Sequence, residues 1–280
     1  MDTSIRATWF VGDLDDPWVK GIASALPQGT RELARTPMGE WPEACRDALP
    51  TGLTLIVHLA LVTNRDIELL ARMRKERTGE VRVILCVGSF SRHADIVQCA
   101  SLVDVILHEA TARDVIRRYA TANEELGQRA SDGRGAVKIN VVSSNFELRQ
   151  ILVEICRTAG YEPRPCAGWD EVGTTGKAIS LWDVPVLEPG WGETLRERAH
   201  SGEVIALIGL PDREHVREAR RNGAIACLEL PGDPADLIEV LDRRTALRAD
   251  GAHDGPPAPR SQRRARDHLV DQQELRDHKS

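Results

Sequence analysis

Two successive series of short apolar runs constrain the fold of this chain more than any other feature. In the first series, Leu53–Leu59 and Val81–Val87 are apolar along most of their length, and segments with apolar residues at helical spacing follow them. The pattern starts again at Val137 and includes Val204–Ile208 and Ala226–Leu230. Continuous apolar runs are typical of parallel strands that are covered on both faces. We therefore predict an α/β fold with two doubly wound, five-stranded parallel sheets in tandem.

The two series look like copies of one unit. In each copy a glycine stops the fourth predicted strand, at Gly88 and at Gly209. The position that closes the fifth strand follows at the same distance in both copies, at Glu109 and at Leu230. Equal spacing of corresponding positions indicates an internal duplication.

Composition sets the expected domain boundaries. We predict one domain at residues 1–122 and a second at residues 137–247. Residues 123–136 are polar and rich in glycine, which is typical of a linker. Residues 248–280 are rich in Gly, Pro, Asp, Arg and Gln, and we predict a mostly disordered tail.

Charge and cysteine content argue against several classes of protein. A net charge of −6 is unusual for a general nucleic-acid binder, which carries a basic face. The longest apolar run, Leu53–Val62, is too short for a membrane span, and the N-terminus lacks the pattern of a secretion signal. The six cysteines form no CxxC pair, so we expect reduced core residues of a cytoplasmic protein rather than zinc ligands.

Enzyme motifs are absent from the sequence. Neither first strand is followed by GxGxxG, and the chain has no GxxxxGK[ST] loop and no GxSxG nucleophile turn. Gly173–Gly176 is a turn before a strand and not a phosphate-binding loop that opens a helix. We therefore expect a protein that is not an enzyme.

The second half carries four short segments, in a fixed order, at the ends of its predicted strands. They are Val141–Asn145 before the first helix, Leu181–Asp183 at the end of the third strand, Val204–Gly209 as the fourth strand, and Leu228–Pro231 at the end of the fifth. In order and spacing, residues 137 to about 244 resemble the receiver domains of response regulators in bacterial two-component signalling. The resemblance implies a flavodoxin-like (CheY-like) fold and a role in phosphorelay signal transduction.

Most residues that perform receiver chemistry differ here. The resemblance implies Asp183 as a possible phosphoacceptor, which attacks the phosphoryl donor as a nucleophile. The other pocket positions are degenerate: Ser143 and Ser144 replace the acidic pair, Ile208 the hydroxyl residue, and Leu230 the lysine. Because Mg²⁺ prefers carboxylate oxygens, we expect no cofactor, and Mg²⁺ only if Asp183 is phosphorylated. Asp183 could instead cap a loop, and an alignment shifted by one residue would place Trp182 at the site.

The first half resembles a receiver more faintly. It keeps an acidic cluster after its first strand, but its third strand ends at His58-Leu59 without an aspartate. Val87 stands at the hydroxyl position and Glu109 at the lysine position. We expect two acids of the cluster, Asp15 and Asp16, to serve a helix N-terminus and His58 to be a hydrogen-bonded core residue.

The leading hypothesis is a non-catalytic, cytoplasmic regulatory protein whose pseudo-receiver domains act as protein-interaction modules. In receivers the output face is formed by the fourth helix, the fifth strand and the fifth helix. The resemblance places this face at Arg213–Arg221, Cys227–Leu230 and Pro234–Arg243, with charge from Arg217, Arg220 and Arg221. The expected partner is a protein, either a second copy or a sensor or regulator, and not a membrane.

Two alternatives remain open at this point. Asp183 could accept a phosphoryl group by an atypical route. The chain could also contact nucleic acid through the basic cluster Arg263–Arg266 of the tail, although the sequence shows no helix-turn-helix motif and the net charge makes nucleic acid an unexpected partner.

Overall fold

The computed structural model describes residues 7–35, 41–45, 52–76, 81–121, 137–173, 178–209 and 211–253. The predicted linker and the basic cluster Arg263–Arg266 therefore lie outside the described residues. The chain divides into two compact units, Met1–Val240 and Leu241–Ser280, and the first unit contains both sheets.

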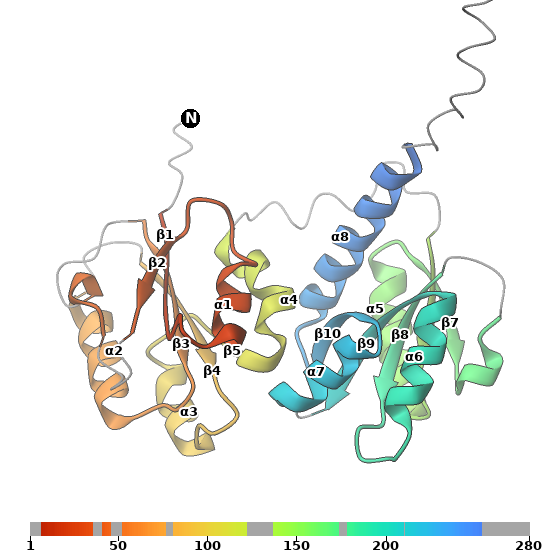
Figure 1. Cartoon of the computed structure of the whole chain (residues 1–280), viewed down its shortest axis with the longest axis horizontal. Coiled ribbons are helices and arrows are strands. Elements are labelled where there is room, and N and C mark those ends of the chain that lie inside the picture. The colour runs from red at the N-terminus through yellow and green to blue at the C-terminus, as the bar shows by residue number, and fades with distance from the viewer. Residues whose placement is uncertain are drawn as a thin grey trace, which may run out of the picture. The chain divides into compact units, whose positions relative to one another are not determined.

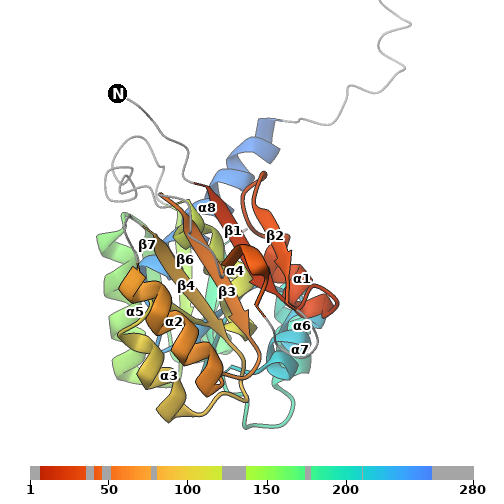
Figure 2. The same ribbon diagram turned by 90° about the vertical axis from the view of Figure 1, so that its left-hand side faces the viewer.

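The first half forms a five-stranded parallel sheet with the strand order β2-β1-β3-β4-β5 (Figure 1). The strands are β1 (Thr8–Gly12), β2 (Arg31–Ala34), β3 (Thr54–Leu59), β4 (Arg82–Val87) and β5 (Val105–His108). The helices are α1 (Pro17–Ala23), α2 (Asn64–Glu76), α3 (His93–Ala100) and α4 (Glu109–Ala120), with a short 3-10 helix at Glu43–Cys45. Figure 2 shows α2 and α3 on one face of this sheet and α1 and α4 on the other.

The second half repeats this arrangement. Its strand order is β10-β9-β8-β6-β7, which reads from the opposite edge as the same 2-1-3-4-5 order. The strands are β6 (Lys138–Val142), β7 (Glu162–Cys166), β8 (Ile179–Val184), β9 (Glu203–Gly209) and β10 (Ala224–Leu230). The helices are α5 (Phe146–Thr158), α6 (Trp191–Ser201), α7 (Arg213–Arg221) and α8 (Pro234–His253). Two doubly wound, flavodoxin-like parallel sheets are thus confirmed.

The central strands are buried as their apolar runs predict. All six residues of β3 and five of the six residues of β4 are buried, and in the second half Val204–Ile208 of β9 are buried as well. Strands in the middle of a parallel sheet lose solvent on both faces because helices cover each face. Because all neighbouring strands pair in parallel, their carboxyl ends lie at one edge of each sheet.

Two helix boundaries differ from those expected. The sequence predicts a helix over Ala112–Ala120, but α4 begins at Glu109, because His108 caps it by accepting a hydrogen bond from the Ala110 amide at 3.2 Å. Helix α8 continues to His253, past the predicted domain end at residue 247, so residues 248–253 are helical and not disordered. Leu247 and Arg248 favour helix, which allows α8 to continue into this segment.

All six cysteines are free and buried. Burial raises the pKa of the Cys86, Cys156 and Cys227 thiols to about 12. Thiols in such surroundings are unreactive, which confirms the expectation of core cysteines. In the described part of the chain, no helix combines the length and the apolar character that a membrane span needs.

The duplicated glycines give a matched pair for a stability test. A Cβ on Gly88 would overlap the backbone carbonyl of Ala60, and the Ala60 Cα would lie 2.8 Å away, whereas nothing lies within 4 Å of a Cβ on Gly209. We expect Gly88→Ala to lower the free energy of unfolding by about 1–3 kcal/mol, and Gly209→Ala to change it by less than about 0.5 kcal/mol. Urea unfolding of both variants measures the difference. Equal effects would contradict the assigned packing at Ala60.

Candidate functional site

The carboxyl edge of the second sheet brings two predicted site residues together. Asp183 is the penultimate residue of β8, and Ser143 directly follows β6, which pairs with β8. The Ser143 hydroxyl donates a hydrogen bond to the Asp183 carboxylate at 2.8 Å. Ser143 is buried, and Asp183 is partly exposed at the edge of the sheet.

The loop after β6 is held by its own polar groups. The Asn145 amide donates to the Ser143 hydroxyl at 3.2 Å, and the Asn145 side chain caps α5 by accepting from the Leu148 amide at 3.1 Å. The Arg149 guanidinium donates to the Ser143 carbonyl. Sequence reasoning did not single out Arg149; its position one helical turn after the Asn145 cap is the signal that places it beside this loop.

The remaining pocket positions hold two apolar residues and an exposed serine. Ile208 is fully buried in β9, and Leu230 ends β10 before a cis peptide bond to Pro231. Ser144 is exposed. Trp182 is buried and packs against Trp169 with a centroid distance of 5.5 Å, so Asp183 rather than Trp182 faces the Ser143 loop.

The donor groups at this edge do not fit a receiver-type Mg²⁺ site. Such a site uses several carboxylate oxygens and water, and here a single carboxylate is present and already accepts from Ser143. Across the described residues, no three His, Cys, Asp or Glu side chains are grouped so as to hold a metal ion. The Arg149 cation is bonded to a backbone carbonyl and not to Asp183.

In the first half, the corresponding positions form a buried pair. His58 near the end of β3 and Glu109 at the start of α4 meet with Nε2 and Oε2 2.6 Å apart, and both side chains are 2% exposed. The prediction of a hydrogen-bonded core histidine is thus confirmed. Burial alone would raise the Glu109 pKa, but hydrogen bonds from His58 and Arg213 outweigh it and lower the pKa to about 2.

The acidic cluster of the first half serves the start of α1. The Asp16 carboxylate accepts from the Trp18 amide at 2.8 Å and is the N-cap of the helix. The Asp13 carboxylate accepts from the Asp15 amide at 3.1 Å. Of the two acids expected to cap, Asp16 does so and Asp15 is exposed at the turn before it.

Arg213, the first residue of α7, connects the two halves. Its guanidinium donates to both carboxylate oxygens of Glu109, at 2.7 and 2.8 Å, and to the Asp16 carboxylate at 2.6 Å. The guanidinium carbons of Arg213 and Arg217 lie 5.8 and 5.2 Å from the centroid of the Trp18 ring. A side chain of the second half therefore binds the His58–Glu109 pair of the first.

Further charged contacts join α4 to the second half. Arg220 donates to the Asp114 carboxylate at 2.6 Å, and Asp114 also accepts from the Cys227 amide at 2.8 Å. Arg118 binds Asp233 and Asp236 near the start of α8. Much of the polar surface of α7, β10 and the first turn of α8 thus contacts the first half of the same chain.

These contacts occupy part of the expected interaction face. We predicted that Arg217, Arg220 and Arg221 offer charge to a separate partner. Arg220 binds Asp114 within the chain, whereas Arg217, which lies over the Trp18 ring, and Arg221 are both exposed. Sequence spacing could not reveal this, because Arg220 and Asp114 lie 106 positions apart and Arg217 and Trp18 about two hundred.

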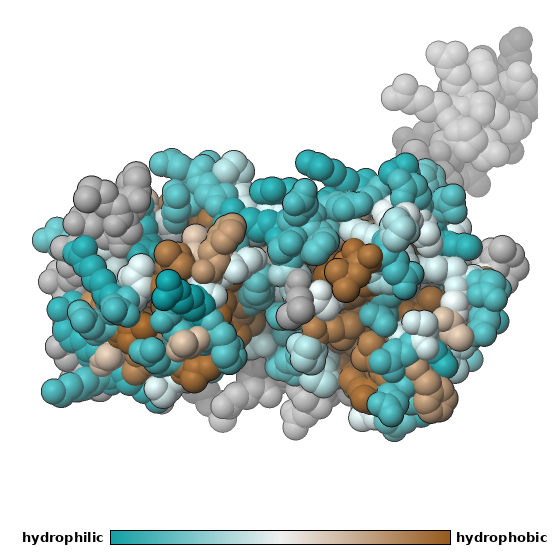
Figure 3. All heavy atoms as spheres, turned by 90° about the horizontal axis from the view of Figure 1, so that it is seen from below, coloured by the Kyte–Doolittle hydropathy of each residue, from teal (hydrophilic) through white to brown (hydrophobic). Residues whose placement is uncertain are grey.

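Exposed apolar side chains lie near the carboxyl edges of both sheets. They are Leu61 and Phe90 in the first half, and Phe146 and Leu187 in the second. Figure 3 shows apolar atoms among hydrophilic ones on this side of both halves. Large exposed apolar groups are more common on surfaces that bind other proteins than elsewhere.

Comparison with known proteins gives matches among solved structures alone. No family model matches the chain, and no curated protein matches it. The chemotaxis protein CheY4 of Vibrio cholerae is 23% identical over 39% of this chain and 98% of its own, with a TM-score of 0.35. A CheY-like receiver domain protein of Methanospirillum hungatei is 18% identical over 42% of this chain and 99% of its own, with a TM-score of 0.38.

A third similar structure spans most of the chain. The C-terminus of RcsC from E. coli, which contains a linker region and a phosphoreceiver domain, is 13% identical over 89% of this chain and 96% of its own, with a TM-score of 0.35. The strand order of both sheets confirms the flavodoxin-like fold that the resemblance to receivers implied.

Proposed function

We propose that this chain is a non-catalytic signalling protein of the two-component type, in which two receiver-like domains act together as a protein-interaction module. One observation carries the proposal: in both receiver-like pockets, side chains of this chain form hydrogen bonds with the carboxylate that lies there. In the first half, Glu109 stands at the lysine position and is bound by His58 and Arg213. In the second half, Asp183 accepts from Ser143.

The chemistry of phosphoryl transfer supports this reading. A phosphoryl group brings negative charge that a metal ion, a cation or hydroxyl groups must stabilise. Beside Asp183 the corresponding positions hold two serines, Ile208 and Leu230, and only the serines can donate a hydrogen bond. In the first half no aspartate ends β3. The pocket residues therefore suit a structural role better than the formation of a phosphoaspartate.

The proposed partner is a protein of the same signalling system, such as a sensor or another regulator. The exposed apolar side chains at the carboxyl edges and the receiver-like fold support a protein partner. Six free, buried cysteines support a location in the reducing cytoplasm.

Intact-mass analysis after incubation with acetyl phosphate and Mg²⁺ tests the proposal. We expect no phosphoryl adduct on the full chain, so the spectrum should match that of the Asp183→Asn variant treated in the same way. An active receiver domain in parallel shows that the reagent works. An adduct that is present in the wild-type protein and lost in Asp183→Asn would contradict the proposal and favour Asp183 as a phosphoacceptor.

A further inference from the structure

A cavity of about 250 Å³ lies between the β5–α4 segment and the β9–β10–α8 segment. Both halves contribute to its apolar wall, which includes Leu107, Leu152, Leu207, Leu228, Leu230 and Pro231. Drug-sized ligands occupy pockets of roughly 300–1,000 Å³, so this cavity suits a smaller molecule, about the size of one ring with a short chain.

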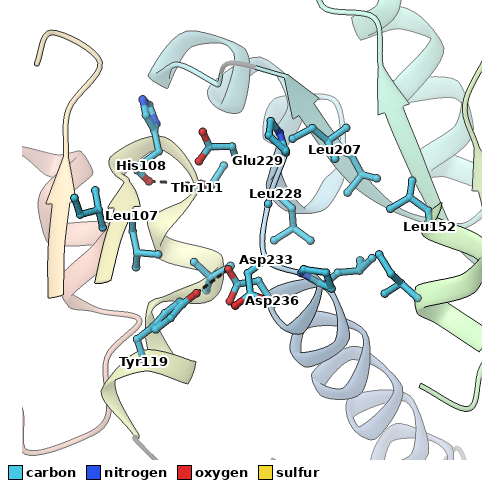
Figure 4. A pocket seen from close by; sticks show the side chains of 18 residues that line it. Leu107, His108, Thr111, Tyr119, Leu152, Leu207, Leu228, Glu229, Asp233 and Asp236 are labelled. Carbon is cyan, nitrogen blue, oxygen red and sulfur yellow. Dashed lines mark hydrogen bonds between the residues drawn. The ribbon is translucent and has the colours of Figure 1, made fainter. Parts of the chain in front are cut away.

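One carboxylate at this cavity, that of Glu229, has no partner in the described part of the chain. Glu229 extends from β10 on the side that faces His108 and Thr111 (Figure 4). Among the described residues, no hydrogen bond or ion pair to the Glu229 carboxylate is found, and burial raises its pKa. The other two acids at the cavity differ, because Arg118 binds Asp233 and Asp236, and Tyr119 also donates to Asp236.

Among the described residues, no cation is found paired with Glu229. His108 is a basic residue of the cavity wall, and burial lowers its pKa from the usual value of 6.5. Its Nδ1 accepts a hydrogen bond from the Ala110 amide, as a neutral imidazole does. Glu229 is partly buried, which makes its charge less favourable than in open solvent, and a bound cation would offset that cost.

We infer that this cavity is a binding site for a small primary amine with an apolar body, the ammonium group facing Glu229. An ammonium supplies the missing positive charge and donates hydrogen bonds to the carboxylate. The apolar wall takes up the body of the ligand. Anions are disfavoured, because the carboxylates of Glu229, Asp233 and Asp236 line the cavity, while Arg118 is already bound to Asp233 and Asp236.

Isothermal titration calorimetry on the full chain, near neutral pH, tests the inference with two probes of matched shape. Phenethylamine carries the ammonium group, and 2-phenylethanol carries a neutral hydroxyl in its place. We expect saturable one-to-one binding of phenethylamine. The affinity for 2-phenylethanol should be at least about tenfold lower, which corresponds to about 1.4 kcal/mol of binding free energy.

Two variants identify the group that is responsible. Glu229→Gln should weaken phenethylamine binding at least about tenfold and leave 2-phenylethanol binding almost unchanged. Glu188→Gln, which makes the same charge change on the exposed loop after β8, should leave both affinities unchanged. Unfolding midpoints of both variants show that each one folds.

Three results would overturn the inference. They are no saturable binding of phenethylamine, equal affinity for the two probes, and an equal loss of affinity in Glu188→Gln and Glu229→Gln. None of these results bears on phosphorylation of Asp183, so a failure here is distinguishable from a failure of the proposed function.

Discussion

Replacement of Arg213 with alanine is expected to lower the free energy of unfolding by about 3 kcal/mol. Glu109 is 2% exposed and would lose two of its hydrogen bonds, while Asp16 would lose its ion pair. A buried carboxylate keeps its desolvation penalty after its partner is removed, so the loss exceeds the net value of the pair itself. Urea unfolding at neutral pH, followed by circular dichroism, measures the change.

Arg217→Ala is the matched control on the same helix. Arg217 is exposed and lies over the Trp18 ring, and its removal should cost less than about 1 kcal/mol, as expected for an exposed cation–π contact. If Arg213→Ala is no more destabilising than Arg217→Ala, the Glu109–Arg213 contact does not stabilise the fold.

Acid is expected to remove a further large part of the stability through Glu109. Its pKa is about 2 in the folded chain and near 4.5 when the chain is unfolded. A lowered folded-state pKa means that the ionised carboxylate favours the folded state. The stabilisation is complete above pH 4.5 and is lost as the pH falls toward 2. Two and a half pKa units correspond to about 3 kcal/mol.

The Glu109→Gln variant isolates this effect. Its free energy of unfolding should be lower at neutral pH and should fall less steeply than that of the wild-type protein between about pH 5 and pH 2. Urea unfolding at several pH values compares the two slopes. Parallel slopes would show that Glu109 does not carry the acid sensitivity and that other carboxylates do.

The fold could be predicted from the sequence because its signals are local. The continuous apolar runs of β3 and β4 specify buried parallel strands, and Gly88 and Gly209 end corresponding strands of two copies. The start of α4 was missed because His108 caps it, and histidine is not a common N-cap residue. The end of α8 was missed because the composition of the tail suggested an earlier end.

The candidate site could be predicted in part. The strand pattern placed Ser143 and Asp183 at one edge of a sheet, and the structure joins them by a hydrogen bond. The Glu109–Arg213 contact could not be found this way, since 104 positions separate the two residues and no periodicity relates them. Arg213 follows the capping residue Asp212 and looks in the sequence like an ordinary first residue of a helix.

One hydrophobic cluster contains residues of both halves, and this affects the cooperativity of thermal unfolding. Ala110 of α4 belongs to the cluster that contains Val142 and Trp182 of the second half, and Trp18 packs against the same cluster. Removal of either half would expose apolar surface of the other. The two copies should therefore unfold in one cooperative transition, in which a substitution in one copy shifts the melting of both.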